Sequence, residues 1–164
     1  MASIVAGNGL FPLTYYVRSN AKSLDTCAVN ELLLHFVLDS SQHTISGVAH
    51  IIGCDSHSTL DTSSFIYGDW CVNTEQVASP IFVVADGVLP YSVFVSNAPA
   101  ERENLKLTLS LSDNWQTGFA NVVYLDAGNW VEMSCAHVTL SACCDVEQLI
   151  ALSHCHQPYK ISGH

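Results

Sequence analysis

The sequence predicts an all-β protein, an antiparallel β-sandwich of about nine strands followed by a short C-terminal helix. Apolar side chains alternate with polar ones over much of the chain, which places one face of each strand against a core. Short runs of turn residues separate these segments, and short connections make consecutive strands antiparallel neighbours. A closed up-and-down β-barrel is the alternative, because both architectures protect the edges of such a sheet.

The clearest strand is predicted at residues 105–111, where leucine alternates with polar residues. Residues 32–38 show the same alternation, but Leu33 and Val37 also make the second face of that strand apolar. We therefore expect this strand at the centre of a sheet or at an oligomer contact. Several strands are too apolar for one face to lie in water, which favours the sandwich over the barrel.

Turn residues place the expected hairpins. Residues 39–43 join the strand at 32–38 to one at 44–52, as a hairpin loop would. The pair Asp86-Gly87 predicts a tight hairpin between strands at 81–85 and 88–95, the second an edge strand or bulged because it contains Pro90. The other expected strands are residues 12–17, 64–72, 119–125 and 130–140.

The end of the chain has a different pattern. Asp145 followed by Gln148 resembles a helix capping box, and Val146, Leu149 and Ile150 recur at helical spacing. The expected organisation is therefore an N-terminal extension at 1–9, an antiparallel β domain at 10–140, and a Cys/His-rich tail with a short helix at 141–164.

Composition restricts the possible partners and the cellular location. The 164 residues fit one domain, and fifteen acidic against five basic residues give a net charge of −10. The five basic residues are scattered, which excludes the basic stripe that nucleic acids and anionic membranes require. No apolar run is long enough to span a bilayer, and the N-terminus lacks the pattern of a signal peptide. We therefore expect a cytoplasmic protein whose seven cysteines are reduced.

Histidine and cysteine gather in two places, at the end of the 44–52 strand and in the C-terminal tail. Imidazole and thiolate suit zinc or another transition metal, and we expect no other cofactor. With eight histidines and seven cysteines such groups also arise by chance, and the CxxC spacing of zinc knuckles is absent. The candidate metal ligands are His50, Cys54, His57, Cys143, Cys144, His154 and His156.

Aromatic residues near strand ends and turns suggest a second kind of site. Rings with polar groups at the rim of a β scaffold suit a sugar or another flat ligand, although the same residues are common in ordinary β cores. The candidate ligand-binding residues are Tyr67, Trp70, Trp115 and Trp130.

Catalytic residues are not indicated. The sequence contains no phosphate-binding glycine motif and no nucleophile elbow. Asp61, Asp69 and Glu132 could belong to a catalytic carboxylate pair, but no spacing selects them over a role as solvated strand-face residues.

Four segments together resemble an uncharacterised bacterial family of small β-rich proteins, a domain of unknown function. They are residues 9–13 (GLFPL), 45–51 (ISGVAHI), 68–70 (GDW) and 111–118 (LSDNWQTG). The resemblance covers most of the chain up to about residue 140. It implies a bacterial origin and a compact β fold, and it brings no activity and no functional residues.

Three hypotheses for function follow. We favour a non-enzymatic β-sheet module that binds a small ligand, such as a carbohydrate, or a protein partner, and that forms a homo-oligomer. The first alternative is a metal-binding protein that uses the histidine and cysteine clusters. The second is a cofactor-independent β-barrel isomerase or cyclase, which needs an internal cavity with one or two buried polar groups.

Overall fold

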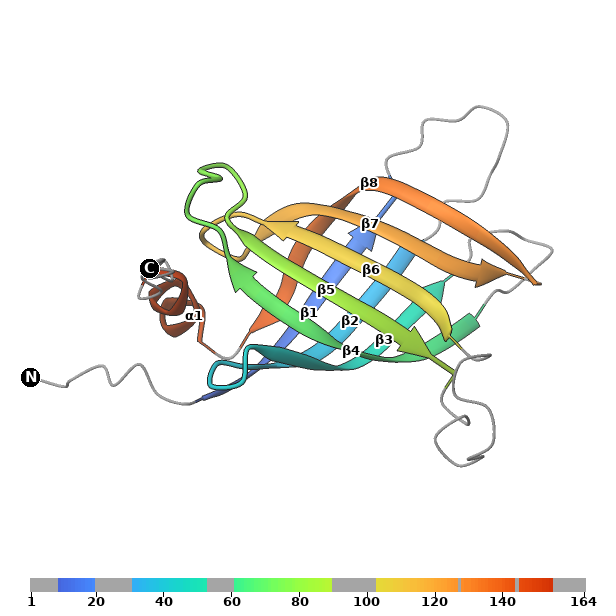
Figure 1. The fold of residues 1–164 in the computed structure, drawn as a ribbon, viewed down its shortest axis with the longest axis horizontal. Coiled ribbons are helices and arrows are strands. Elements are labelled where there is room, and N and C mark those ends of the chain that lie inside the picture. The colour runs from blue at the N-terminus through green and yellow to red at the C-terminus, as the bar shows by residue number, and fades with distance from the viewer. Residues whose placement is uncertain are drawn as a thin grey trace, which may run out of the picture.

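The protein is a closed eight-stranded antiparallel barrel in the computed structural model, with one short helix at one end (Figure 1). The structure describes residues 9–19, 31–52, 61–89, 103–126, 128–143 and 145–154. Each strand pairs with its neighbours in the sequence, and β1 also pairs with β8. The elements are β1 (Leu10–Arg18), β2 (Glu31–Asp39), β3 (Thr44–Ile52), β4 (Asp61–Val72), β5 (Ile81–Val88), β6 (Glu103–Leu111), β7 (Thr117–Asp126), β8 (Asn129–Cys143) and α1 (Val146–His154).

The barrel corrects the expected sandwich. Residues 13–18 of β1 pair with β8, so the sheet closes on itself and its inner face surrounds the core. The second apolar face of β2, with Leu33 and Val37, is half-buried on the outside of the barrel rather than packed against another sheet. An apolar outer face was therefore the wrong criterion for choosing between the two architectures.

The expected hairpin at Asp86-Gly87 is also wrong, and this reduces the strand count from nine to eight. Strand β5 runs straight through both residues, and Asp86 pairs with Tyr67 on β4 and Lys106 on β6. Residues 90–95 of the expected next strand lie outside the described residues. Strand pairing on both sides of this dipeptide outweighs its local propensity to form a turn.

Glycines on the inner face allow the strands to bend around the barrel. A Cβ atom added to Gly68 would lie 1.9 Å from the carbonyl oxygen of Val84 on the neighbouring strand. Gly47 and Gly118 occupy the same kind of position, with backbone oxygens 2.0 and 2.1 Å from the added atom. Strong curvature brings adjacent backbones this close on the inner side, and only glycine fits there.

The end of the barrel that carries α1, which we call the helix end, is filled by large aromatic residues. The Tyr15 hydroxyl donates a hydrogen bond of 2.8 Å to the backbone oxygen of Trp115. The Trp115 ring packs edge-to-face on Trp70, with 5.7 Å between ring centroids. Leu149 and Leu152 of α1 are buried in the same core, so the helix covers this end.

The predicted helix is confirmed, and it begins where the capping pattern indicates. The backbone N–H of Gln148 donates a hydrogen bond of 3.0 Å to the Asp145 carboxylate. The Ser153 hydroxyl lies 2.8 Å from the backbone oxygen of Ile150 in the helix and 3.2 Å from that of Asp113 in the β6–β7 turn, and it shares one hydrogen between them. Strand β8 continues to Cys143, beyond the expected boundary at residue 140. No helix in the described ranges is long and apolar enough to cross a membrane.

Candidate functional site

The opposite end of the barrel has a different interior. We call it the distal end: β1 ends there at Arg18, β5 ends at Val88, and β6 begins at Glu103. The inner wall of β3, β4 and β5 carries small residues toward this end, whereas the helix end holds Trp70 and Trp115. These small residues are Ala49, Ser64, Ala85 and Gly87.

A buried polar pair lies within this wall of small residues. The Ser64 hydroxyl donates a hydrogen bond of 2.8 Å to Oδ1 of Asn104, and the two residues are only 1% and 3% exposed. The two strands that carry them, β4 and β6, are separated by β5. The bond crosses β5 at Gly87, where the missing side chain leaves room; an added Cβ would lie 3.1 Å from Cβ of Ser64.

A β-bulge brings Asn104 into the interior. Leu105 pairs with Gly87, but the next pair along the strands is Glu103 with Val88, so Asn104 is the additional residue of β6. Asn104 and Leu105 are consecutive and both buried, which regular strand alternation would not allow. The bulge thus places an amide side chain among apolar neighbours.

The Asn104 amide has an unused donor. Its Nδ2 atom is buried and makes no hydrogen bond within the part of the chain that the structure describes. A buried donor without a partner costs about 1–3 kcal/mol. The indole N–H of Trp115, at the helix end, is a second such donor among the described residues. A ligand oxygen that accepts a hydrogen bond from the Asn104 amide would remove that cost.

Charged residues stand at the described rim of the distal end. Glu31, Glu103 and Asp126 lie at strand ends there. Among the residues that the structure describes at this end, Arg18 lies 3.2 Å from Glu31 and Lys106 lies 3.6 Å from Glu103. These exposed pairs contribute little stability, but they neutralise the two positive charges.

Tyr124 lies on the inner face of β7, the neighbour of β6, where it pairs with Leu105. It is 2% exposed, and burial, followed by the charge of Asp126, raises the pKa of its hydroxyl. Tyr124 therefore stays protonated at neutral pH and contributes a polar group that carries no charge.

The four aromatic residues predicted to bind a ligand do not form one site, and only Trp70 and Trp115 contact each other. Trp70 and Trp115 are buried at the helix end, where His43 also stacks on Trp70 at 4.7 Å. Tyr67 and Trp130 are 56% and 48% exposed on the outer surface. Their strands, β4 and β8, lie on opposite sides of the closed barrel, so these two rings cannot form one platform.

The predicted metal ligands are also separated. His50 lies on β3 and its Nδ1 atom is 2.8 Å from the Ser63 hydroxyl; Cys143 ends β8 and His154 ends α1. The described ranges contain no group of three or more His, Cys, Asp or Glu residues that could hold a metal ion. The remaining candidates, Cys54, His57, Cys144 and His156, lie outside the described residues.

The candidate carboxylates do not form a facing pair where the structure describes them. Asp69 lies on β4 and Glu132 on β8, on opposite sides of the barrel. Glu132 accepts a hydrogen bond from its neighbour Ser134 and is part of the solvated surface.

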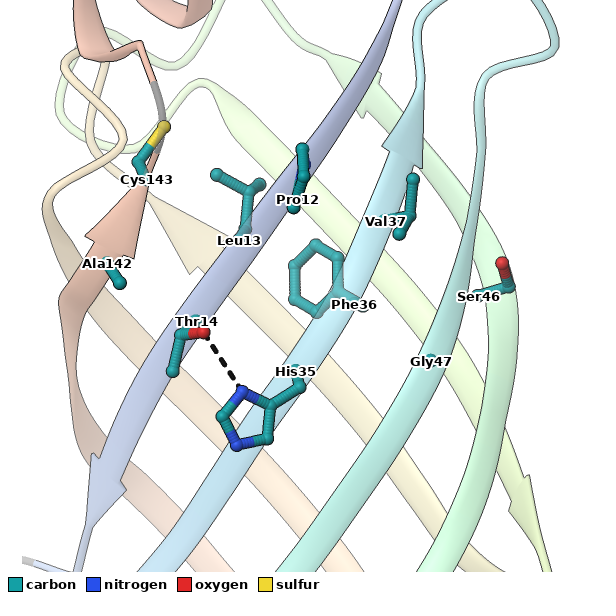
Figure 2. A pocket seen from close by; sticks show the side chains of 10 residues that line it. All are labelled: Pro12, Leu13, Thr14, His35, Phe36, Val37, Ser46, Gly47, Ala142 and Cys143. Carbon is teal, nitrogen blue, oxygen red and sulfur yellow. Dashed lines mark hydrogen bonds between the residues drawn. The ribbon is translucent and has the colours of Figure 1, made fainter.

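A hollow of about 390 Å³ lies on the wall formed by β1, β2, β3 and the end of β8 (Figure 2). Figure 2 shows Thr14 and His35 turned toward each other, and Oγ1 of Thr14 lies 2.9 Å from Nδ1 of His35. Ser46, Gly47 and Cys143 also line this hollow. Because its hydroxyl and imidazole already satisfy each other, it offers less unmet hydrogen bonding than the distal end.

Sequence reasoning missed Ser64 and Asn104. Asn104 directly precedes the leucine alternation of its strand, and Gly87 was taken as part of a turn. The site depends on a bulge and on contact across a third strand, and neither has a local sequence signal.

The fold and the site define a small up-and-down β-barrel with one sealed end and one end that buries an unsatisfied amide. The chain belongs to the family described as Domain of unknown function (DUF1842), which matches residues 8–130. This confirms the resemblance drawn from the four sequence segments. The match stops at the second residue of β8, so most of the closing strand and α1 lie beyond it. No curated protein matches the chain.

Proposed function

We propose that this protein is a non-enzymatic barrel that binds a small ligand inside its distal end. The observation that carries the proposal is the buried Nδ2 atom of Asn104, which finds no partner among the described residues. In a polar pair kept for stability alone, the hydrogen-bonding groups of both side chains would have partners. Ala49, Ala85 and Gly87, which have small side chains or none, lie on the same inner wall as the pair.

Catalysis at the same place is less well supported than binding. A cofactor-independent isomerase or cyclase could use the Asn104 amide to stabilise negative charge on a substrate oxygen. Such an enzyme also needs a group that takes up or releases a proton near neutral pH. Tyr124 is the nearby titratable residue on the inner face, and its raised pKa makes it a poor base at that pH. The barrel therefore supports a binding protein better.

The binding proposal is tested by fluorescence titration with the neutral apolar dye N-phenylnaphthylamine. We expect saturable binding of one dye per barrel. Ala49→Met should abolish it, because the longer side chain extends from the wall beside Ser64. Ser110→Met, on the outer face of β6, is the matched control and should bind as wild type does. Unchanged binding by Ala49→Met, or no saturable binding by the wild type, would count against the proposal.

We also propose that the barrel forms a homo-oligomer through the outer face of β3, β4 and β5. Half of the exposed large apolar side chains in the described ranges lie on these adjacent strands: Ile52, Phe65, Tyr67 and Val84. Phe65 pairs with Val48 on one side and Val88 on the other, which makes an uncharged row across three strands. An exposed apolar row of this kind is typical of a protein–protein contact. A single monomer species in sedimentation velocity across micromolar concentrations would contradict this proposal.

A further inference from the structure

The hydrogen-bonding state of Asn104 restricts what a ligand must offer. Its Oδ1 atom already accepts the Ser64 hydroxyl hydrogen at 2.8 Å, and Nδ2 remains as a donor without a partner in the described part of the chain. A ligand next to this amide must therefore present an acceptor, such as a carbonyl, ether or hydroxyl oxygen. A purely hydrocarbon ligand would leave the donor unsatisfied, as it is now.

The charges around the distal end restrict the ligand further. Glu31, Glu103 and Asp126 stand at this rim, and Arg18 and Lys106 are each paired with one of these glutamates. A carboxylate or phosphate ligand would leave water, enter a chain of net charge −10, and find a neutral amide as its partner. An uncharged ligand meets none of these costs.

The interior next to the amide is apolar apart from the polar pair and Tyr124. Ala49, which pairs with Ser64, and Leu105, which follows Asn104 in the chain, are buried and offer only side-chain carbon. A sugar would bury several hydroxyl groups, each of which needs a partner, and the described interior supplies too few. The body of the ligand must therefore be mainly hydrocarbon.

We infer that the distal end binds an uncharged, mainly apolar molecule with one hydrogen-bond acceptor, such as a ketone or an ester, whose oxygen accepts from Nδ2 of Asn104. This inference rests on the proposed ligand-binding function and names the class of ligand. It separates the site from barrels that bind fatty acids, because a carboxylate is excluded here. The same inference distinguishes the site from a sugar-binding rim, because the ligand is recognised inside the barrel.

Three matched probes test the class of ligand. The first is the neutral ketone dye prodan, the second is its analogue with the carbonyl reduced to a methylene, and the third carries a carboxylate in place of the ketone. Dissociation constants are measured by fluorescence titration and by calorimetry at one salt concentration. We expect the ketone to bind about tenfold or more tightly than the methylene analogue, as one rescued buried hydrogen bond predicts. The carboxylate should bind more weakly than either.

Variants of the amide connect this preference to Asn104. Asn104→Leu should bind the ketone and the methylene analogue equally, with the affinity for the methylene analogue within about threefold of wild type. Asn129→Leu, an exposed asparagine at the start of β8, is the matched control and should keep the full ketone preference. The double variant Ser64→Ala/Asn104→Leu removes both polar groups. It replaces Asn104→Leu in the same binding measurements if that single variant folds poorly.

The outcomes separate the two proposals. Equal binding of ketone and methylene analogue by the wild type, or tighter binding of the carboxylate, would overturn the inferred ligand class while leaving a ligand-binding barrel. A ketone preference that persists in Asn104→Leu and in the double variant would overturn the role of this amide. No saturable binding of any of the three probes would overturn the proposed function itself.

Discussion

Replacing Ser64 by alanine and Asn104 by leucine together distinguishes a polar pair kept for binding from one kept for stability. Both side chains are almost completely buried, and they share one hydrogen bond. The double variant removes the bond, the unsatisfied Nδ2 atom and the hydroxyl at once, and leaves no orphaned partner. If the pair exists for a ligand, the protein without ligand should become more stable.

The magnitude follows from three contributions. Loss of the Ser64–Asn104 hydrogen bond costs about 0.5–1.5 kcal/mol, and removal of the unpaired donor returns about 1–3 kcal/mol. A buried leucine adds apolar burial of about 1.5–3 kcal/mol, part of which imperfect packing at the bulge offsets. We expect the free energy of unfolding to rise by about 1–3 kcal/mol. For a chain of this size each kcal/mol raises the Tm by about 2–4 °C.

Urea unfolding of the ligand-free protein, followed by tryptophan fluorescence, measures this change. The midpoint should rise while the slope of the transition stays constant, since the surface exposed on unfolding hardly changes. The single variant Ser64→Ala should instead lose about 1–3 kcal/mol, because it leaves Oδ1 of Asn104 without its donor. A double variant less stable than wild type by more than about 1 kcal/mol would refute the reasoning, because the pair would then be structural.

Three further predictions concern the barrel itself. Gly68→Ala should cost about 3 kcal/mol or more in thermal unfolding, since its Cβ would overlap a backbone oxygen; Gly128→Ala, at a φ of 83° with open space around it, should cost only about 1 kcal/mol. Burial raises the pKa of Tyr15 above its ordinary 10.0, so the stability that depends on its protonated hydroxyl is complete below pH 10 and is lost at higher pH. Tyr15→Phe should be about 1–2 kcal/mol less stable than wild type at neutral pH, and its stability should fall less steeply with rising pH above about pH 10, as followed by circular dichroism. The same pH dependence in both proteins would contradict this role of Tyr15. Phe65→Glu should shift sedimentation toward the monomer, whereas Phe119→Glu, on the other side of the barrel, should leave the oligomer intact.

The strands and the helix were predictable because their signals are local. Alternation of leucine with polar residues at 105–111 depends only on which side chains share a face, and β6 ends at the predicted Leu111. The Asp145–Gln148 pattern likewise acts within one helical turn, and the observed hydrogen bond confirms it. At Asp86-Gly87 the local signal was overruled, because pairing with both β4 and β6 stabilises the extended backbone.

The family segments recognised in the sequence turn out to serve the architecture. Three of the four contain an inner-face glycine at which adjacent backbones approach closely: Gly47, Gly68 and Gly118. Two of them also contribute Trp70 and Trp115, the packed pair at the helix end. The polar pair Ser64 and Asn104 lies outside all four segments, so the resemblance could indicate the fold without indicating a function.

The sequence by itself determined that this protein is an antiparallel β domain with a terminal helix, because strand faces, turns and caps are encoded within a few residues. Only the tertiary structure decided that the sheet closes, because closure depends on β1 meeting β8 from the far end of the domain. It alone also brought Ser64 to Asn104, forty positions later in the chain, through a bulge and across a glycine of the intervening strand. Pairings of this kind depend on the register of several strands together, and no single segment carries that information.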